Sequence, residues 1–108
     1  MKLHVDDIGG DIVKDTDVYL LKDNTTLKNL VLSSTRLKPN KSTRGHKHDG
    51  CEEVYYFING SGTMELDEKI IMVDPGDVVL VEDGVFHRVH ASQAGCYFIC
   101  IFNEKRSH

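Results

Sequence analysis

Apolar and polar residues alternate in short runs along most of the chain, and turn-forming residues separate the runs. A period of two is typical of β-strands that bury one face. Residues 12–21 also fit a short helix or a loop leading into a strand, and we favour the strand. The pattern predicts strands at 18–21, 30–37, 53–58, 63–66, 70–73, 78–81, 85–90 and 96–102. Without a long amphipathic helix, the chain is expected to be an all-β sandwich or barrel.

Turn signals rich in Gly, Pro, Asn and Asp stand between these strands. One of them, Asn59-Gly60-Ser61-Gly62, predicts a tight hairpin, because Asn-Gly readily adopts positive φ angles. Residues 63–66 would then pair back on 53–58. The other predicted turns are at 22–26, 67–69, 74–77 and 82–84.

Composition and charge exclude several classes of protein. The 108 residues support one domain, and 40% hydrophobic with 28% charged residues is usual for a globular protein. A net charge of −4 argues against nucleic acid as a partner. The longest apolar run, residues 96–102, is too short to span a membrane. No apolar stretch follows Lys2, so we expect no signal peptide and a cytoplasmic location.

The segment from Arg44 to Gly60 carries the strongest chemical signal. In an extended segment His46 and His48 point to the same face. The Asp49-Gly50 pair predicts a turn, and Glu53 opens the next strand. Two imidazoles and a carboxylate suit a divalent transition metal.

These residues resemble the first signature of the cupin family, in which His-x-His is followed at fixed spacing by Glu and Gly. His46, His48, Glu53 and Gly60 hold those places. The second cupin signature resembles the run from Gly76 to His87, in which Gly76, Gly84 and His87 match. Departures from the family pattern occur at Asn40, Glu82 and Ala91, where the family usually has Gly, Pro and Asn.

The resemblance implies a single-domain jelly-roll β-barrel. Residues 30–102 would form the barrel core, residues 1–29 would add N-terminal strands and a turn packed on it, and residues 103–108 would be a polar tail. It also implies that His46, His48, Glu53 and His87 bind one metal ion, which sequence alone leaves open as Fe, Mn, Ni, Co or Zn. A homodimer is a further expectation from the family.

Side chains on the faces of the metal donors are candidates for the rest of the site. Tyr55 and Phe57 share the face of Glu53. Glu53 and Tyr55 are the candidate proton carriers. On the last strand we expect Phe98, Cys100 and Phe102 to point inward, although parity alone also allows the opposite set. The candidate substrate contacts are Arg36, Phe57, Cys100 and Phe102, and the aromatic ones are also read as core filling.

The remaining histidines and the cysteines are expected to have no metal role. His90 falls on the strand face opposite His87, and it and His4 are predicted to be surface residues. Cys96 and Cys100 would lie roughly 13 Å apart on one strand, beyond disulfide reach. Cys51 is interpreted as a small loop residue rather than a ligand, and all three cysteines are predicted to be thiols.

Three functions are compatible with such an open metal site. The first is an isomerase, epimerase or lyase acting on a small sugar-like or keto-acid substrate. The second is an Fe(II) dioxygenase of a small thiol or diol. The third is a non-catalytic module that binds or senses a small oxyanion or carboxylate.

Overall fold

The computed structural model describes residues 1–47 and 50–103, and within them it contains seven strands and no helix, so none that could span a membrane. This confirms the all-β prediction. The strands are β1 (Asp11–Asp15), β2 (Tyr19–Asn24), β3 (Val31–Leu37), β4 (Glu53–Leu66), β5 (Lys69–Val73), β6 (Val78–Val81) and β7 (His87–Phe102).

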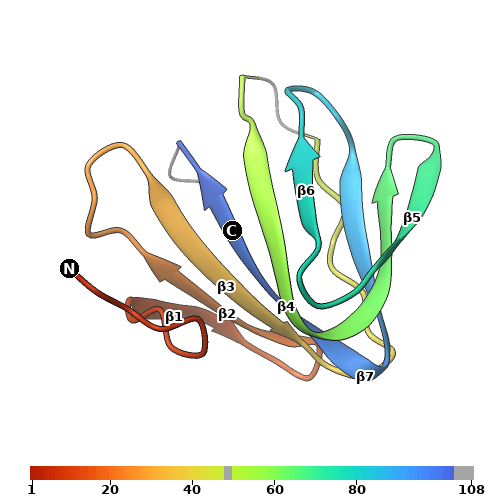
Figure 1. The fold of residues 1–108 in the computed structure, drawn as a ribbon, viewed down its shortest axis with the longest axis horizontal. Coiled ribbons are helices and arrows are strands. Elements are labelled where there is room, and N and C mark those ends of the chain that lie inside the picture. The colour runs from red at the N-terminus through yellow and green to blue at the C-terminus, as the bar shows by residue number, and fades with distance from the viewer. Residues whose placement is uncertain (48–49, 104–108) are drawn as a thin grey trace.

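All seven strands belong to one antiparallel sheet, in the order β1-β2-β3-β7-β4-β5, and β6 pairs with the start of β4. The long strands β4 and β7 bend midway, so the sheet folds over and its two parts face each other (Figure 1). The first half-sheet contains β1, β2, β3, the end of β7, the start of β4 and β6. The second half-sheet contains the start of β7, the end of β4 and β5. The result is a jelly-roll β-barrel, as predicted.

The predicted hairpin at residues 59–62 was wrong, because β4 runs through this segment without reversing. The pairing of β4 with β7 shifts register twice here, between Phe57 and Asn59 and between Gly60 and Gly62. A Cβ on Gly60 would lie 2.1 Å from the carbonyl oxygen of Gly95. The glycines therefore serve a bend in which two strands cross closely, and residues 63–66 pair with β5 and β7 instead.

The N-terminal part is more regular than its sequence predicts. The segment 12–21, for which a strand was favoured over a helix or loop, contributes to two strands, and β1 (Asp11–Asp15) pairs with β2. The predicted turn at 22–26 was partly wrong, because Lys22 to Asn24 continue β2 along the whole length of β3. Cross-strand pairing thus overrides the turn-forming tendency of Asp23 and Asn24.

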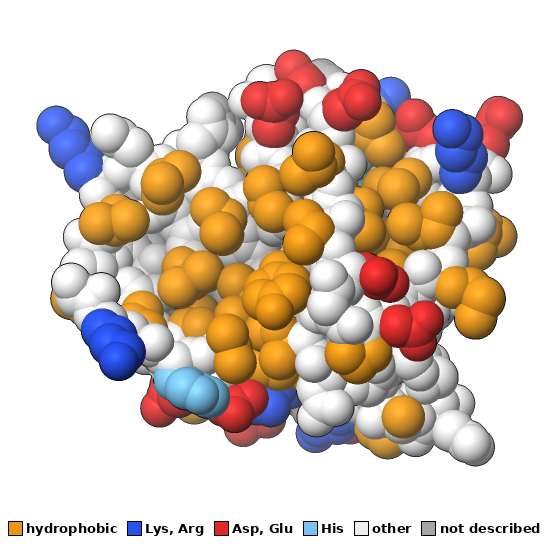
Figure 2. Space-filling view, in the orientation of Figure 1, with side chains coloured by type: hydrophobic (Ala, Val, Ile, Leu, Met, Phe, Trp, Pro, Cys, Tyr) orange, Lys and Arg blue, Asp and Glu red, His pale blue; other side chains and the backbone are white. Residues whose placement is uncertain are grey.

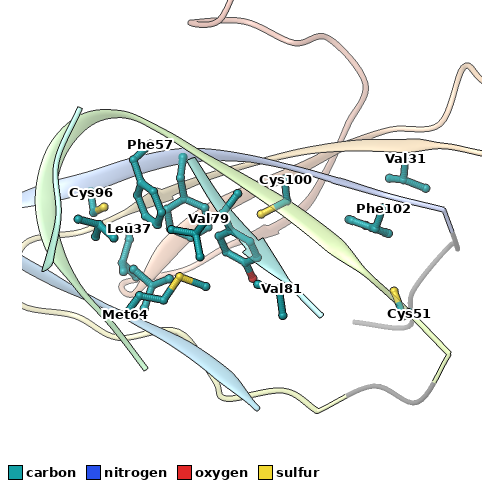
Figure 3. Packing of buried hydrophobic residues seen from close by; sticks show 14 residues of the cluster. Val31, Leu37, Cys51, Phe57, Met64, Val79, Val81, Cys96, Cys100 and Phe102 are labelled. Carbon is teal, nitrogen blue, oxygen red and sulfur yellow. The ribbon is translucent and has the colours of Figure 1, made fainter. Parts of the chain in front are cut away.

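The core fills the space between the two half-sheets. Phe57, Leu37 and Met64 lie at one end of the barrel, and Val31, Phe102 and Cys51 lie at the other (Figure 3). Side chains from both half-sheets belong to the same cluster, since Met64 and Val89 of the second pack with residues of the first. Phe98, Cys100 and Phe102 point into this core, as predicted.

Both faces of β7 are buried from Gly95 to Cys100, whereas Ile101 is exposed. Tyr97 and Ile99 point outward but are also buried. The Tyr97 hydroxyl donates a hydrogen bond to the carbonyl oxygen of Val5, and the nearby Ile8 is buried as well. The N-terminal segment therefore lies over the outside of the first half-sheet, which explains why burial is continuous where alternation was expected.

Burial raises the pKa of the Cys96 thiol to about 11. Only the thiolate reacts with disulfide reagents, so native Cys96 is expected not to react at pH 8. Thiol titration should find three reactive groups per chain after denaturation without reductant. Prompt modification of Cys96 in the folded protein, identified by mass spectrometry, would contradict this, as would fewer than three thiols in the denatured chain.

Candidate metal site

The segment that carries the first histidine lies alongside the start of β7. Ser42 and His46 form isolated β-bridges with His90 and His87. The backbone of the same segment is held by hydrogen bonds from Thr43 N to Val89 O and from Ala91 N to Lys41 O, both 2.8 Å. Residues 41–46 thus act as an additional edge of the second half-sheet.

Gly45 allows this close approach. A Cβ at position 45 would lie 2.2 Å from the ring of Phe86. The ring therefore occupies the space next to the backbone, one residue before His46. A larger residue at position 45 would have to displace the Phe86 ring or the segment itself.

His46 and His87 are directly opposed across this edge. His46 N donates to His87 O at 3.0 Å, and His87 N donates to His46 O at 2.9 Å. Residues that exchange both backbone bonds point their side chains to the same face. Their imidazole rings lie 6.0 Å apart between centroids, inclined at 40°. Two residues that are 41 positions apart in the sequence therefore present nitrogen donors together.

Glu53 approaches the same point from the first half-sheet. It is the first residue of β4, paired with Val81 on one side and Phe102 on the other. Glu53 and His87 are each only 3% exposed. Glu53 Oε2 lies 3.7 Å from His87 Nε2. The fold thus brings a carboxylate and an imidazole from opposite half-sheets together in a buried position.

The orientation of the His87 ring is fixed by the backbone. Its Nδ1 lies 3.0 Å from the carbonyl oxygen of Val85. A carbonyl oxygen can only accept, so Nδ1 carries a proton, and Nε2, the atom that faces Glu53, is the ring nitrogen left to bind a metal ion. Such an outer hydrogen bond is the usual way in which proteins orient a metal-binding histidine.

The spacing of Glu53 and His87 is compatible with a shared metal ion. Two atoms that each bind one ion at about 2.1 Å lie no more than about 4.2 Å apart, and the 3.7 Å between Glu53 and His87 is within this limit. In the part of the chain that the structure describes, no three His, Cys, Asp or Glu side chains are arranged as a complete site. The fourth predicted ligand, His48, lies outside the described residues.

Aromatic side chains close the barrel beneath these donors. The Tyr55 ring stands edge-on to His87, with 5.7 Å between centroids and 76° between planes. Tyr55, Phe57 and Phe98 also contact one another at centroid distances of 5.4 to 6.2 Å. Tyr55 is therefore the aromatic residue placed against the donors. Phe57, Cys100 and Phe102, proposed from sequence as substrate contacts, are almost fully buried in the core.

Arg36, the predicted anion-binding residue, lies elsewhere. It is exposed on the outer face of β3, and its guanidinium carbon is 3.9 Å from the centre of the Tyr97 ring. Its NH2 group donates a 2.7 Å hydrogen bond to the carbonyl oxygen of Asp6. The structure thus places Arg36 where it holds the N-terminal segment, outside the barrel interior.

His90 was predicted to be a simple surface residue, and this was wrong. It is half-buried, its Nε2 lies 2.6 Å from Glu65 Oε2, and its Nδ1 lies 2.6 Å from Ser42 Oγ. These contacts join residues 41–46 to β7 and β4. Alternation correctly placed His90 opposite His87, but which strands cover that face depends on pairings that are distant in the sequence.

Two loops meet beside the donors at the open end of the barrel. The backbone N of Gly50 donates a 2.6 Å hydrogen bond to Asp83 Oδ1. Cys51, adjacent to Gly50, is buried. Glu82, which stands where cupins usually have Pro, is exposed. The loops before Glu53 and before His87 are therefore tied to each other.

Comparison with known proteins supports the same conclusion about the fold. Residues 33–102 match the family described as "Cupin domain". An oxalate-binding protein from Thermotoga maritima is 30% identical over 70 residues, which cover 65% of this chain and 58% of that protein. The chain thus matches little more than half the length of this relative.

Solved structures with low sequence identity share the fold. KdgF from Halomonas sp. superposes with a TM-score of 0.79 at 18% identity, covering 90% of this chain and 88% of the other. An oxalate decarboxylase from Bacillus subtilis, studied for its Mn(II) centres, superposes with a TM-score of 0.75 at 24% identity. That match covers 84% of this chain and 26% of the decarboxylase.

Proposed function

The chain belongs to the cupin family. On this basis we propose that it is a small metal-dependent enzyme that catalyses the isomerisation or epimerisation of a small sugar-like or keto-acid substrate, or an elimination from it. The observation that carries this proposal is the buried pair of Glu53 and His87, with His46 directly opposite His87. Burying a carboxylate and an imidazole lowers the stability of a fold, and such buried pairs in a barrel are typical of functional sites.

His46, Glu53 and His87 would hold the metal, together with His48 by its place in the cupin signature. A divalent ion at such a site supplies Lewis-acid polarisation of a substrate carbonyl or hydroxyl. The donor set suits Fe, Mn, Ni, Co or Zn, and the Mn(II) centres of the structurally similar decarboxylase make Mn the first ion to test.

The chain's own residues limit the substrate to a small molecule. The packed rings of Tyr55, Phe57 and Phe98 close the barrel beneath the donors, so a substrate binds only from the mouth. Among the described residues no Lys or Arg side chain is buried. Recognition of a carboxylate inside the barrel therefore falls to the donor cluster rather than to an arginine clamp.

Tyr55 is the residue best placed to move a proton besides Glu53. Its ring contacts the His87 ring, and the side chain is buried. A buried phenol next to the donors can deliver a proton to a substrate held there, and the phenolate that results can take a proton back, while the surrounding rings exclude water. Glu53 is the alternative carrier.

A second function is supported by one relative. The matched Thermotoga maritima protein is named for oxalate binding. Oxalate is a small dicarboxylate that can bind through two oxygens, and it fits the size limit set by the aromatic rings. The chain would then be a metal-dependent binding or sensing module for a small carboxylate.

One experiment separates these functions. The protein is purified anaerobically, its metal content is measured, and small 2-keto acids, 2-hydroxy acids and uronic acids are followed by NMR. We expect about one ion per chain and turnover that needs no O₂, stops with a chelator and returns with the metal. Oxygen consumption during turnover would instead identify a dioxygenase. Saturable, metal-dependent oxalate binding without turnover of any compound would identify a binding module.

A further inference from the structure

The outer face of the second half-sheet carries a hydroxyl, an imidazole and a carboxylate in contact with one another. On the side of the molecule that Figure 2 shows, hydrophobic side chains occupy the centre. Around residue 90 the outer face carries polar groups instead. Ser42 Oγ lies 2.6 Å from His90 Nδ1, and Glu65 Oε2 lies 2.6 Å from His90 Nε2. We call Ser42, His90 and Glu65 the outer triad.

The two contacts of His90 determine which of its nitrogens can act as a base. A carboxylate only accepts hydrogen bonds, so the Nε2 that faces Glu65 carries a proton. In the neutral ring this leaves a lone pair at Nδ1, which accepts the hydroxyl proton of Ser42. A nucleophile, a base in contact with it and a third group that orients the base are the parts of an activated serine. The two ring nitrogens are exchanged relative to the serine protease triad, but the chain of hydrogen bonds is the same.

The strand pairing positions Ser42 for attack on a carbonyl group. Ser42 and His90 form an isolated β-bridge, and the backbone hydrogen bonds on either side of it join their neighbours. The bridge is therefore a non-hydrogen-bonded pair, in which the two side chains come closest and the N–H of Ser42 points away from β7. An amide N–H of the nucleophile's own residue is a usual donor to the oxyanion that forms in acyl transfer.

Space for a small molecule lies beside the outer triad. A hollow of about 270 Å³ borders His90, and Met72 and Ala91 supply apolar surface to it. This volume is just below the usual range for ligand pockets, which begins at about 300 Å³, so a short acyl ester is the size that fits. Among the described residues that line the hollow, Asp74 is charged and none is Lys or Arg, which disfavours an anionic ester. The side chains of His90 and Glu65 are 34% and 29% exposed, so a dissolved reagent reaches them.

We propose that Ser42 is a second reactive centre, independent of the metal, which takes the acyl group from small uncharged esters. Ser42 Oγ attacks the ester carbonyl carbon while His90 Nδ1 takes the hydroxyl proton and Glu65 stabilises the imidazolium. His90 then gives this proton to the departing alcohol oxygen as the ester C–O bond breaks, which leaves Ser42 acylated. A water molecule, deprotonated by His90, releases the carboxylic acid and restores Ser42. This activity goes beyond the proposed function, because none of the three groups is a metal donor.

The test is covalent labelling of the folded protein with a fluorophosphonate, together with hydrolysis of p-nitrophenyl acetate. Mass spectrometry should find one adduct per chain, on Ser42. Ser42→Ala should remove the adduct and lower kcat/KM for the ester at least about 100-fold, since general-base activation contributes about 100- to 10,000-fold. Glu65→Gln should slow labelling at least about 10-fold, because the amide no longer stabilises the imidazolium. Circular dichroism verifies that both variants fold.

Ser92→Ala is the matched control. Ser92 borders the same hollow, but its Oγ lies 2.8 Å from the hydroxyl of Ser61 rather than against an imidazole. This variant should be labelled at the wild-type rate, and so should the wild type in the presence of a chelator. A folded wild type that forms no adduct, or an adduct that survives Ser42→Ala, would overturn the proposal. Loss of labelling with the chelator would also overturn it, because the reactive centre would then be the metal site.

Discussion

His87→Ala is expected to lower metal affinity at least about 100-fold and to abolish any metal-dependent activity. Changes to residues that merely orient a metal ligand cost 10- to 100-fold, so removal of a ligand should cost at least as much. His87 is also the donor that contacts both other described donors, Glu53 through its Nε2 and His46 across the β-bridge. Metal content after dialysis and calorimetric titration with Mn(II) would measure the loss.

Two further variants make this experiment specific. Glu53→Gln should weaken binding less than His87→Ala, because the amide oxygen can still coordinate. His4→Ala should change nothing, since His4 is exposed and its ring contacts Asp6, two residues further along the chain. Wild-type metal content in His87→Ala, with the β-sheet spectrum intact, would show that the donor set is assigned wrongly.

His90→Ala is expected to lower the stability of the fold, an effect that its sequence position does not predict. It should retain the metal but lose about 1 kcal/mol or more of folding free energy, since Glu65 and Ser42 each lose a 2.6 Å contact. It therefore separates a residue that supports the histidine segment from residues that bind the ion. Equal metal loss in His90→Ala and His87→Ala would remove this distinction.

Gly60→Ala is expected to cost about 4 kcal/mol or more of folding free energy, an exceptional value for one methyl group. Gly60 has a φ of 74°, and its new Cβ would lie 2.1 Å from the carbonyl oxygen of Gly95. Relief would require β4 and β7 to separate at their shared bend. Since domains of this kind have a total stability of about 5 to 15 kcal/mol, urea unfolding should show a large fall in the midpoint.

Gly76→Ala provides the matched control for backbone strain. Gly76 has a φ of 94°, but no heavy atom lies within 4 Å of its hypothetical Cβ. It should cost only about 1 to 2 kcal/mol, the usual cost of left-handed backbone in an alanine. If the two substitutions shifted the urea midpoint equally, close strand crossing at Gly60 would not be the cause.

The alternation of apolar and polar residues predicted the strands well, but it predicted the connections between them less well. Alternation found β3, β5 and β6 almost to the residue, because each buries one face and ends at a turn signal. Gly60 and Gly62 led to the wrong prediction of a hairpin, because glycine permits either a hairpin or a bend. The choice is decided by Gly95 and His90, whose carbonyl oxygens lie against these glycines from a strand more than 25 residues away.

The candidate site shows the same limit. Spacing in the sequence nominated His46, Glu53 and His87 as metal ligands, and the fold brings these three residues close together. It was not enough to locate Arg36, because whether an outward side chain faces solvent or the N-terminal segment depends on tertiary packing. The role of His90 was missed for the same reason. His90 pairs with Thr63 of β4, and Glu65 lies two residues further along that strand. The contact between His90 and Glu65 could be recognised only once this pairing was known.

The bends of β4 and β7 also determine how a ligand can enter and leave. Each of these strands runs through both half-sheets without interruption. The two half-sheets are therefore not expected to open by a hinge motion. The Gly50–Asp83 hydrogen bond, by contrast, joins two loops at the mouth and can break without disturbing a strand. We therefore expect a molecule that binds at the proposed site to enter and leave on the timescale of loop motion rather than of domain closure.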